Sequence, residues 1–312
     1  MLDGLDEIDD PQVRQQVVDW VQKQMIVYNQ NRFLVTSRPF GYRSNPLSGV
    51  AVLEVRPFTL EQVEQFVQKW YLANEIMNKQ KDDPGVRMRA GAEAKSLLQQ
   101  LHNTPSLFAL TVNPLLLTMI ATVHRYGGAL PGNRVALYAE ICEVFLGQRQ
   151  KARGQVLELT PNQMQLVLEP LAYYLMLKGI LDITLVEARE VVEGTLAQVS
   201  LQMMPEAFLR LVENTSGLLL ERENGVYSFA HLTFQEYLAA IHIREKQWGN
   251  TLATHVGESW WQETIRLYCG MADATPIITT CLAGDPPSTT ALTLSLDCLQ
   301  EAFRVQPGVR DQ

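Results

Sequence analysis

Acidic residues crowd the start of the sequence. Five acids and no basic residue lie within the first ten positions, namely Asp3, Asp6, Glu7, Asp9 and Asp10. An Asp at the C-terminal end of a central parallel strand can hold a hydrated Mg²⁺ against nucleotide phosphates, and an acid just beyond it can orient or deprotonate the attacking water. Asp3, Asp6 and Glu7 have that arrangement. Taken alone, the cluster is more typical of a merely solvated acidic N-terminus.

Arg38 is the second candidate for phosphate chemistry. The run Arg32-Phe-Leu-Val-Thr-Ser-Arg-Pro39 predicts a short buried strand that ends in a polar turn and is stopped by proline. Neighbouring strands of an open α/β sheet end in the same crevice, where ligands bind, and an Arg there can reach a γ-phosphate through a forked, charge-assisted contact. The alternative for Arg38 is a surface residue that caps a turn.

The elements that must position these side chains follow an α/β pattern. Apolar residues at helical spacing predict a helix over residues 11–24, and a second strand is predicted over 50–55. The first 56 residues therefore predict an acidic turn, a helix, a strand, a turn and a strand, with parallel connections. This is one part of the fold class that we predict, which is mainly α with a partial α/β region.

The remainder of the sequence predicts helices almost throughout. Helical spacing begins at Thr59 and continues in 92–101 and 107–123, with a surface loop over 79–91, a glycine-rich linker over 127–132 and a further helix over 135–149. Helices over 161–177, 185–199 and 205–215 then precede a hairpin around Asn224-Gly225 and a helix over 233–247. Three helices, a hairpin and another helix are the order of a winged-helix domain. Beyond Gly249 the helical pattern is compatible with one or two repeat units.

Four segments, in the right order within residues 1–245, resemble NACHT-type signalling NTPases, which belong to the STAND class of P-loop NTPases. Leu2-Asp-Gly-Leu-Asp-Glu-Ile8 resembles their extended Walker B box, and Phe33-Leu-Val-Thr-Ser-Arg-Pro39 resembles their sensor 1. Asn113-Pro-Leu-Leu-Leu-Thr-Met-Ile120 resembles the helical-domain segment whose proline lies near adenine. Phe229-Ala-His-Leu-Thr-Phe-Gln-Glu-Tyr-Leu-Ala-Ala240 resembles the winged-helix motif, and is the most specific of the four.

The resemblance implies a nucleotide-dependent oligomerisation switch in signal transduction or defence, closed with ADP and open with ATP. It implies the C-terminal half of the nucleotide-binding core in 1–56, a helical domain in 57–126, a winged-helix domain in 127–249 and a helical, repeat-like region in 250–312. The implied site residues are Asp3 for Mg²⁺ through water, Asp6 and Glu7 for catalysis, and Arg38, Pro114 and His231 for nucleotide binding.

Simpler roles remain open for the last two residues. Pro114 fits the first turn of a helix whether or not it also touches adenine. His231, which the resemblance places on the β-phosphate of ADP, is also compatible with a capping or core histidine. Phe234, Tyr237 and Leu238 have helical spacing and are expected to pack in the core.

One departure from the family pattern limits the expected activity. The phosphate-binding loop G-x-x-x-x-G-K-[ST] occurs nowhere in the 312 residues. We therefore expect an N-terminally truncated NACHT ATPase that lacks appreciable ATPase activity on its own and binds Mg²⁺ and ATP or ADP weakly or not at all. The alternative function is a non-catalytic helical and winged-helix scaffold for protein interactions.

Composition and charge limit the classes of binding partner and the cellular compartment that we expect for the chain. The net charge of −8 disfavours general attraction to nucleic acid or anionic lipid. Four cysteines without C-x-x-C spacing, and an N-terminus that is acidic where a signal peptide would be basic, favour a reducing, cytoplasmic location. The longest uncharged stretch, 103–124, is interrupted by Asn113-Pro114, so we expect a buried helix there and no membrane span. No His/Cys cluster has metal-ligand spacing.

Overall fold

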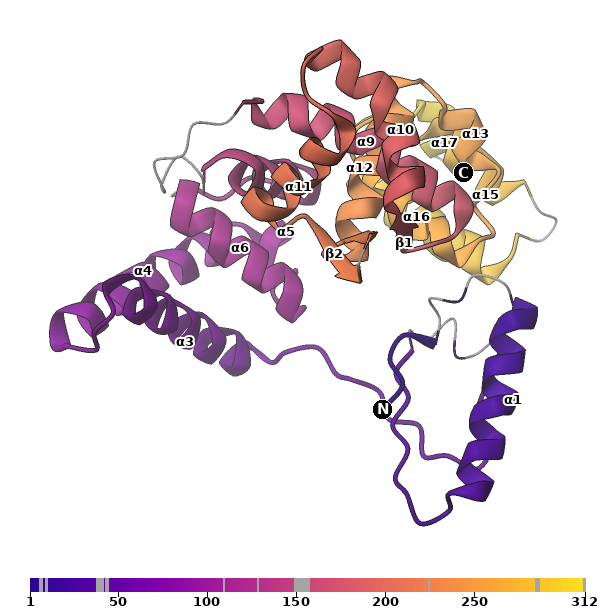
Figure 1. Cartoon of the computed structure of the whole chain (residues 1–312), viewed down its shortest axis with the longest axis horizontal. Coiled ribbons are helices and arrows are strands. Elements are labelled where there is room, and N and C mark those ends of the chain that lie inside the picture. Colours follow the sequence, from indigo (N-terminus) through magenta and orange to yellow (C-terminus); the bar gives the residue numbers. More distant parts are fainter. Residues whose placement is uncertain are drawn as a thin grey trace. The chain divides into compact units, whose positions relative to one another are not determined.

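The part of the chain that the structure describes is mainly helical, with one small sheet of three strands (Figure 1). The computed structural model describes residues 1–5, 8, 11–37, 42, 45–108, 110–127, 129–148, 158–223, 225–283 and 287–310. These residues form two compact units. Unit 1 comprises 1–53, 166–213 and 218–312, and unit 2 comprises 54–165 and 214–217. Within the described part of the chain, no helix has the length and apolar character needed to cross a membrane.

The N-terminal part of unit 1 is built on helix α1 (Pro11–Val27), which confirms the predicted helix and extends it by three residues. Leu2 and Val35 form an isolated parallel β-bridge, with Leu2 N donating to Leu34 O at 2.8 Å and Thr36 N donating to Leu2 O at 2.9 Å. Beneath the bridge, α1 contributes to a small buried cluster made of Leu5, Val18, Val21 and Leu47. Of the strand predicted from Arg32 to Pro39, the described residues therefore form one parallel pairing, between Val35 and Leu2.

The prediction of a strand over residues 50–55 is wrong. These residues belong to no helix or strand, and Val52, Leu53 and Val55 are 65%, 87% and 95% exposed. In this fully described stretch, residues 50–57 make no backbone hydrogen bond. Their β-branched and apolar side chains favour a strand, but a strand needs neighbouring strands to pair its backbone and cover its faces.

Unit 2 contains helices α3 (Leu60–Lys79), α4 (Pro84–His102), α5 (Pro105–Phe108), α6 (Pro114–Gly127) and α7 (Arg134–Glu143), followed by the π-helix η2 (Val144–Gln148). Helix α3 begins with a capping box between Thr59 and Gln62 and packs on α4 and α6. The loop predicted over 79–91 is wrong beyond Asp83, because Asp83 caps α4 and Pro84 occupies its first turn. The single helix predicted over 107–123 is also wrong, since a new helix starts at Pro114.

A buried hydrogen-bond chain ties three helices of unit 2 together. Tyr71 Oη of α3 lies 2.6 Å from His124 Nδ1 of α6, and Ser96 Oγ of α4 lies 3.1 Å from His124 Nε2. Burial lowers the pKa of His124, so the neutral ring is the favoured form.

The predicted order of three helices, hairpin and helix is confirmed. Helices α9 (Pro161–Lys178), α10 (Leu185–Val199) and α11 (Pro205–Ser216) precede strands β2 (Leu219–Glu223) and β3 (Val226–Phe229) and helix α12 (Leu232–Glu245). The hairpin turns at Gly225, whose φ of +76° favours glycine. A short strand that the sequence pattern did not indicate, β1 (Asp182–Thr184), pairs antiparallel with β3, so the sheet order is β1-β3-β2.

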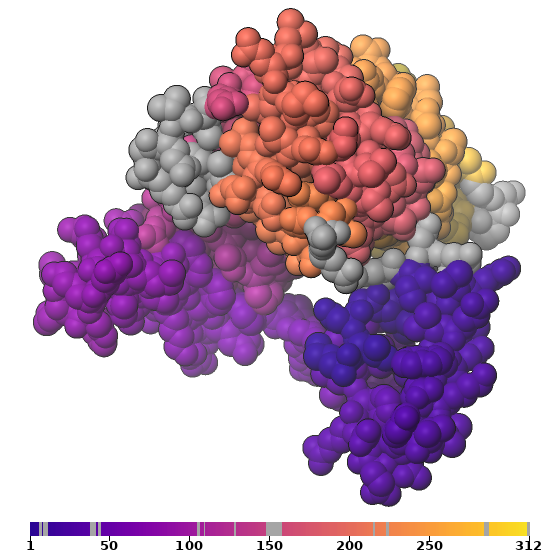
Figure 2. All heavy atoms as spheres, in the orientation of Figure 1, coloured from indigo at the N-terminus to yellow at the C-terminus, as the bar shows by residue number. Residues whose placement is uncertain are grey.

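Short helices complete unit 1, namely α13 (Gly249–Ala253), η3 (Ser259–Trp261), α14 (Gln262–Cys269), α15 (Thr275–Leu282), α16 (Thr289–Glu301) and α17 (Pro307–Arg310). They stack in two rows. Helices α12, α14 and α16 pack in sequence in one row, and α13, α15 and α17 pack in sequence in the other. In the space-filling view the yellow C-terminal helices and the orange winged-helix segment form a continuous mass (Figure 2).

Candidate functional site

The parallel bridge at Leu2 places the first candidate residue, Asp3, beside the strand that leads to Arg38. Thr36 Oγ1 donates a hydrogen bond to Asp3 Oδ1 and accepts one from Gly4 N at 3.0 Å. Leu5 N donates to Thr36 O at 2.9 Å. Gly4 has a φ of +71°, a left-handed conformation that glycine adopts without strain and that directs its N–H to Thr36. The carboxylate of Asp3 is therefore oriented by a hydroxyl on the neighbouring strand.

The chemistry of this pair fits a hard cation. Asp3 is exposed, and its carboxylate and the Thr36 hydroxyl are oxygen groups of the kind that Mg²⁺ prefers, directly or through water. The described residues hold no group of three or more His, Cys, Asp or Glu side chains that could bind a metal by themselves. An ion at Asp3 would therefore depend on water and on the phosphates of a nucleotide for most of its ligands.

Asp6, Glu7 and Arg38, the candidates for water activation and γ-phosphate contact, lie outside the described residues. Their roles stay predictions. Gly4 and Thr36 were not predicted as site residues. Thr36 contacts the carboxylate of Asp3, and Gly4 contacts Thr36 through its backbone N–H. The signal that could have identified Thr36 is a hydroxyl residue at the end of the strand predicted from Arg32, which neighbours the segment that carries Asp3.

Pro114 lies in the first turn of a helix, as the simpler of its two interpretations predicts. It is the first residue of α6 and is exposed. Asn113 caps this helix, because its Oδ1 accepts hydrogen bonds from Leu115 N at 2.9 Å and from Leu116 N at 3.4 Å. Proline suits this position, since the first helical N–H has no partner within the helix. A contact of Pro114 with adenine stays a prediction.

His231 is the N-cap of α12. Its backbone is extended, and its Nδ1 accepts a hydrogen bond from Thr233 N at 3.2 Å. In the neutral ring, an accepting Nδ1 places the proton on Nε2, which makes Nε2 a hydrogen-bond donor. The side chain is exposed and stands at the positive end of a 14-residue helix. A donor at a helix N-terminus is a favourable surrounding for a phosphate group.

The helices and strands that present His231 lie in a segment that resembles a known protein family. Residues 134–243 match a family described as the winged helix-turn-helix domain C-terminal to NACHT. This segment is a NACHT-associated winged-helix domain. No curated protein matches the chain.

Helix α12 of the winged-helix domain carries His231 as its N-cap, and the helix itself is mostly buried. Ten of its fourteen residues are buried, including Phe234, Tyr237 and Leu238, which confirms that these three pack in the core. Gln235 reaches back across the domain, donating from Nε2 to Ile180 O at 3.2 Å. A helix fixed on so many sides positions its N-cap precisely relative to the sheet, with His231 two residues beyond the end of β3.

The candidate residues are distributed over both units. Asp3 and His231 belong to unit 1, and Pro114 belongs to unit 2. The structure brings Asp3 together with Thr36. The winged-helix domain supplies His231, and the helical region supplies Pro114 as the first residue of α6.

Proposed function

We propose that this chain is the C-terminal part of a NACHT-type signalling ATPase that acts as a nucleotide-dependent switch. The observation that carries the proposal is the NACHT-associated winged-helix domain in residues 134–243. The parallel pairing of Leu2 with Val35 supports it, because Asp3 directly follows one member of this pair and its carboxylate accepts a hydrogen bond from Thr36, which directly follows the other. In this proposal, 1–56 are the second half of a parallel-sheet nucleotide core whose phosphate loop precedes Asp3 in the intact protein.

The exposed apolar segment 50–55 supports the same proposal. It has strand-forming residues, but it lies in no strand and has no backbone partner among the described residues. A sheet that included further strands would pair this backbone and cover Val52, Leu53 and Val55. An incomplete core therefore accounts for the failure of an otherwise favourable strand sequence to form one.

The proposed residue roles follow the chemistry of each group. Mg²⁺, when bound, would neutralise phosphate charge; Asp3 would hold it through water, and Asp6 and Glu7 would orient the attacking water. Arg38 would sense the γ-phosphate. Pro114 would lie near adenine, and His231 would donate from Nε2 to the β-phosphate of ADP.

The proposed switch depends on the His231 contact. ADP would bridge the nucleotide core and the winged-helix domain, holding the protein closed, and exchange for ATP would release the bridge and favour self-oligomerisation. We place this activity in cytoplasmic signalling or defence.

Nucleotide discrimination tests this role of His231. Fluorescent ADP should bind the chain weakly, and more tightly than the matching AMP analogue, because only ADP carries the β-phosphate. His231→Asn keeps a capping side chain, but its shorter amide does not reach the position of Nε2, so it should abolish the preference for ADP over AMP. The measurement is a fluorescence titration of each analogue in the presence of Mg²⁺.

The control is His102→Asn, an exposed histidine on α4 that lies outside the proposed site. This variant should leave the preference for ADP intact. Absence of any difference between ADP and AMP would contradict the proposed bridge and favour the interaction scaffold. A robust, Asp3-dependent ATPase rate from the chain alone would contradict the incomplete core.

A further inference from the structure

Three of the four cysteines come together in the C-terminal helices of unit 1. Cys269 is the last residue of α14, Cys281 lies in α15 and Cys298 lies in α16, and all three are buried. Helix α16 packs on both α14 and α15, and the three thiols lie close enough to interact electrostatically. The fourth cysteine, Cys142, belongs to α7 of unit 2. The three helices therefore share one junction that contains three thiols.

The Cys269 and Cys298 thiols of this junction are in direct contact. They form a hydrogen bond with each other, which links α14 to α16. The backbone brings the same region together, because Phe303 N, just beyond α16, donates to Cys269 O at 2.9 Å. Two thiols that touch across a helix–helix interface have the proximity that a disulfide requires.

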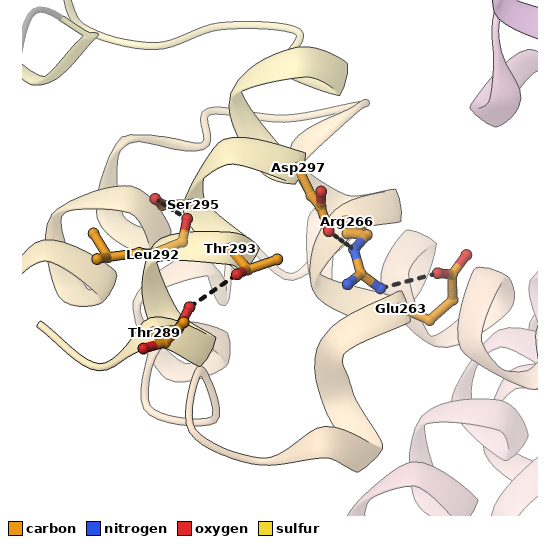
Figure 3. A network of polar contacts seen from close by, with 7 residues as sticks. All are labelled: Glu263, Arg266, Thr289, Leu292, Thr293, Ser295 and Asp297. Atoms are coloured by element: carbon orange, nitrogen blue, oxygen red, sulfur yellow. Dashed lines mark hydrogen bonds and ion pairs between the residues drawn. The ribbon is translucent and has the colours of Figure 1, made fainter. Parts of the chain in front are cut away.

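An ion pair joins α14 and α16 beside the two thiols. Arg266 Nε of α14 donates to Asp297 Oδ2 of α16 at 2.9 Å, and Arg266 Nη1 lies 3.5 Å from Glu263 Oε2 (Figure 3). Arg266 lies three residues before Cys269, and Asp297 directly precedes Cys298. The ion pair therefore holds the two helices together at the level where the thiols meet.

Helix α16 is the element whose opening would expose the two thiols. Only three of its thirteen residues are buried, namely Leu294, Ser295 and Cys298. Segments with few buried apolar contacts open locally at a lower free energy than the core does. Because Cys298 is one of the three anchoring residues and covers Cys269, the departure of α16 from α14 exposes both thiols at once.

The closed structure protects the thiols from oxidation. The hydrogen bond with Cys298, and then burial, raises the pKa of Cys269 well above its ordinary value. Burial, with a smaller contribution from Cys298, raises the pKa of Cys281 to about 11. The thiolate is the reactive form of cysteine, so oxidation must wait for the opening of α16, which returns the thiols to water.

We propose that Cys269 and Cys298 are a redox modification site, at which a small-molecule disulfide such as oxidised glutathione converts the two thiols into a disulfide between α14 and α16. In the open state one cysteine thiolate attacks the oxidant, whose S–S bond breaks, and a mixed disulfide forms as one thiol of the oxidant leaves. The second cysteine then attacks the protein sulfur of the mixed disulfide and releases the other thiol. The two cysteines lose two electrons and two protons, which the oxidant carries away as two thiols. The disulfide fixes α16 on α14.

Peptide mapping of the oxidised full chain tests this site. A protease that cleaves before aspartate separates the three cysteines, since it cuts at Asp273, Asp285 and Asp297. The chain is incubated with oxidised glutathione, its remaining thiols are alkylated in denaturant, and the digest is analysed with and without reductant. The expected product joins the peptide that contains Cys269 to the peptide that contains Cys298, and reductant separates them.

Hydrogen exchange measures the effect of the disulfide on α16. The amides of α16 should exchange at least roughly tenfold more slowly in the oxidised chain, because the disulfide prevents the opening. A chain whose cysteines all stay reduced, or that stops at the mixed disulfide, would overturn the proposal. A disulfide that involves Cys142 or Cys281, or unchanged exchange of α16 in the linked chain, would overturn it as well.

A pair of cysteine variants identifies the partners. Cys298→Ser removes one thiol of the pair and should leave no disulfide at Cys269. Cys142→Ser is the matched control, because Cys142 is also buried but lies in unit 2, and it should form the same disulfide as the wild type. A disulfide at Cys269 that persists in Cys298→Ser would contradict the assignment.

A pair of arginine variants tests the gating by α16 without removing a cysteine. Arg266→Gln removes the ion pair with Asp297, so α16 should open more often and the disulfide should form about two- to fivefold faster, the range expected for a partly exposed ion pair. Arg189→Gln removes an ion pair with Glu206 between α10 and α11 and should leave the rate unchanged. Equal rates in Arg266→Gln and the wild type would refute the gating on which the proposal rests.

Discussion

Replacement of Gly249 by alanine is expected to lower the free energy of unfolding by about 1–3 kcal/mol. Gly249 is buried at the first position of α13, where a Cβ would overlap Tyr268 Oη and lie 3.1 Å from Tyr268 Cζ. Tyr268 belongs to α14 and is only 6% exposed, so its ring has little room to move. Urea or thermal unfolding of the Gly249→Ala variant measures the loss.

Two matched variants separate this clash from a general effect of substituting glycine. Nothing lies within 4 Å of a Cβ built on Gly257, so Gly257→Ala should change stability by less than about 0.5 kcal/mol. Tyr268→Phe removes the overlapping hydroxyl, so the double variant should be more stable than the sum of the two single changes predicts. Equal costs for Gly249→Ala and Gly257→Ala would show that the approach of Gly249 to Tyr268 is not tight.

Acidification from pH 6.5 to pH 4 is expected to destabilise unit 1 through His242. Burial, with a smaller contribution from Lys246, lowers the pKa of His242 from 6.5 to about 4. The unfolded chain therefore binds a proton in this range while the folded chain does not, so stability is present above pH 6.5 and is lost as the pH falls toward 4. Allowing for partial solvent exposure of the ring, the loss is about 1–2 kcal/mol.

The surroundings of His242 explain this cost and supply the control. Its ring stacks on Tyr173 of α9 at 5.2 Å and lies 5.7 Å from the Trp248 ring, so a charge there would be poorly solvated. His242→Phe keeps an aromatic ring but does not titrate, so its unfolding free energy should vary less between pH 6.5 and 4. A residual slope from His124, whose pKa burial also lowers, is expected in unit 2. An unchanged slope in His242→Phe would refute the assignment.

The helices of the winged-helix domain could be predicted because their boundaries are encoded locally. Helix α10 has the predicted bounds, and Thr184 and Glu187 form the capping box that starts it. The hairpin around Gly225 could be predicted because its turn requires a residue with a left-handed backbone conformation, which glycine adopts readily. Strand β1 was missed because three residues carry too little pattern, and its pairing with β3 depends on residues far away in the sequence.

The failed predictions differ in their physical origin. The segment 50–55 has the composition of a strand, but its conformation depends on neighbouring strands that the described residues do not supply. The start of α4 was a misinterpreted local signal, since Asp83-Pro84 is an N-cap followed by a first-turn proline. In the candidate site, the α/β pattern predicted that the strand from Arg32 neighbours the segment that carries Asp3, and the bridge between Leu2 and Val35 agrees with this, whereas the left-handed Gly4 that joins Asp3 to Thr36 became evident only from the backbone.

Segment 50–57, which is largely exposed and makes no backbone hydrogen bond, also determines where a protease can cut the chain. Proteases bind their substrates as extended strands, and exposed segments without backbone hydrogen bonds are the ones they reach first. A glutamyl endopeptidase would find the Glu54–Val55 bond in this stretch, whereas Pro57 hinders a trypsin-type enzyme at Arg56. Brief digestion would therefore divide the polypeptide just ahead of α3, separating the acidic candidate site from the winged-helix domain by a single cleavage.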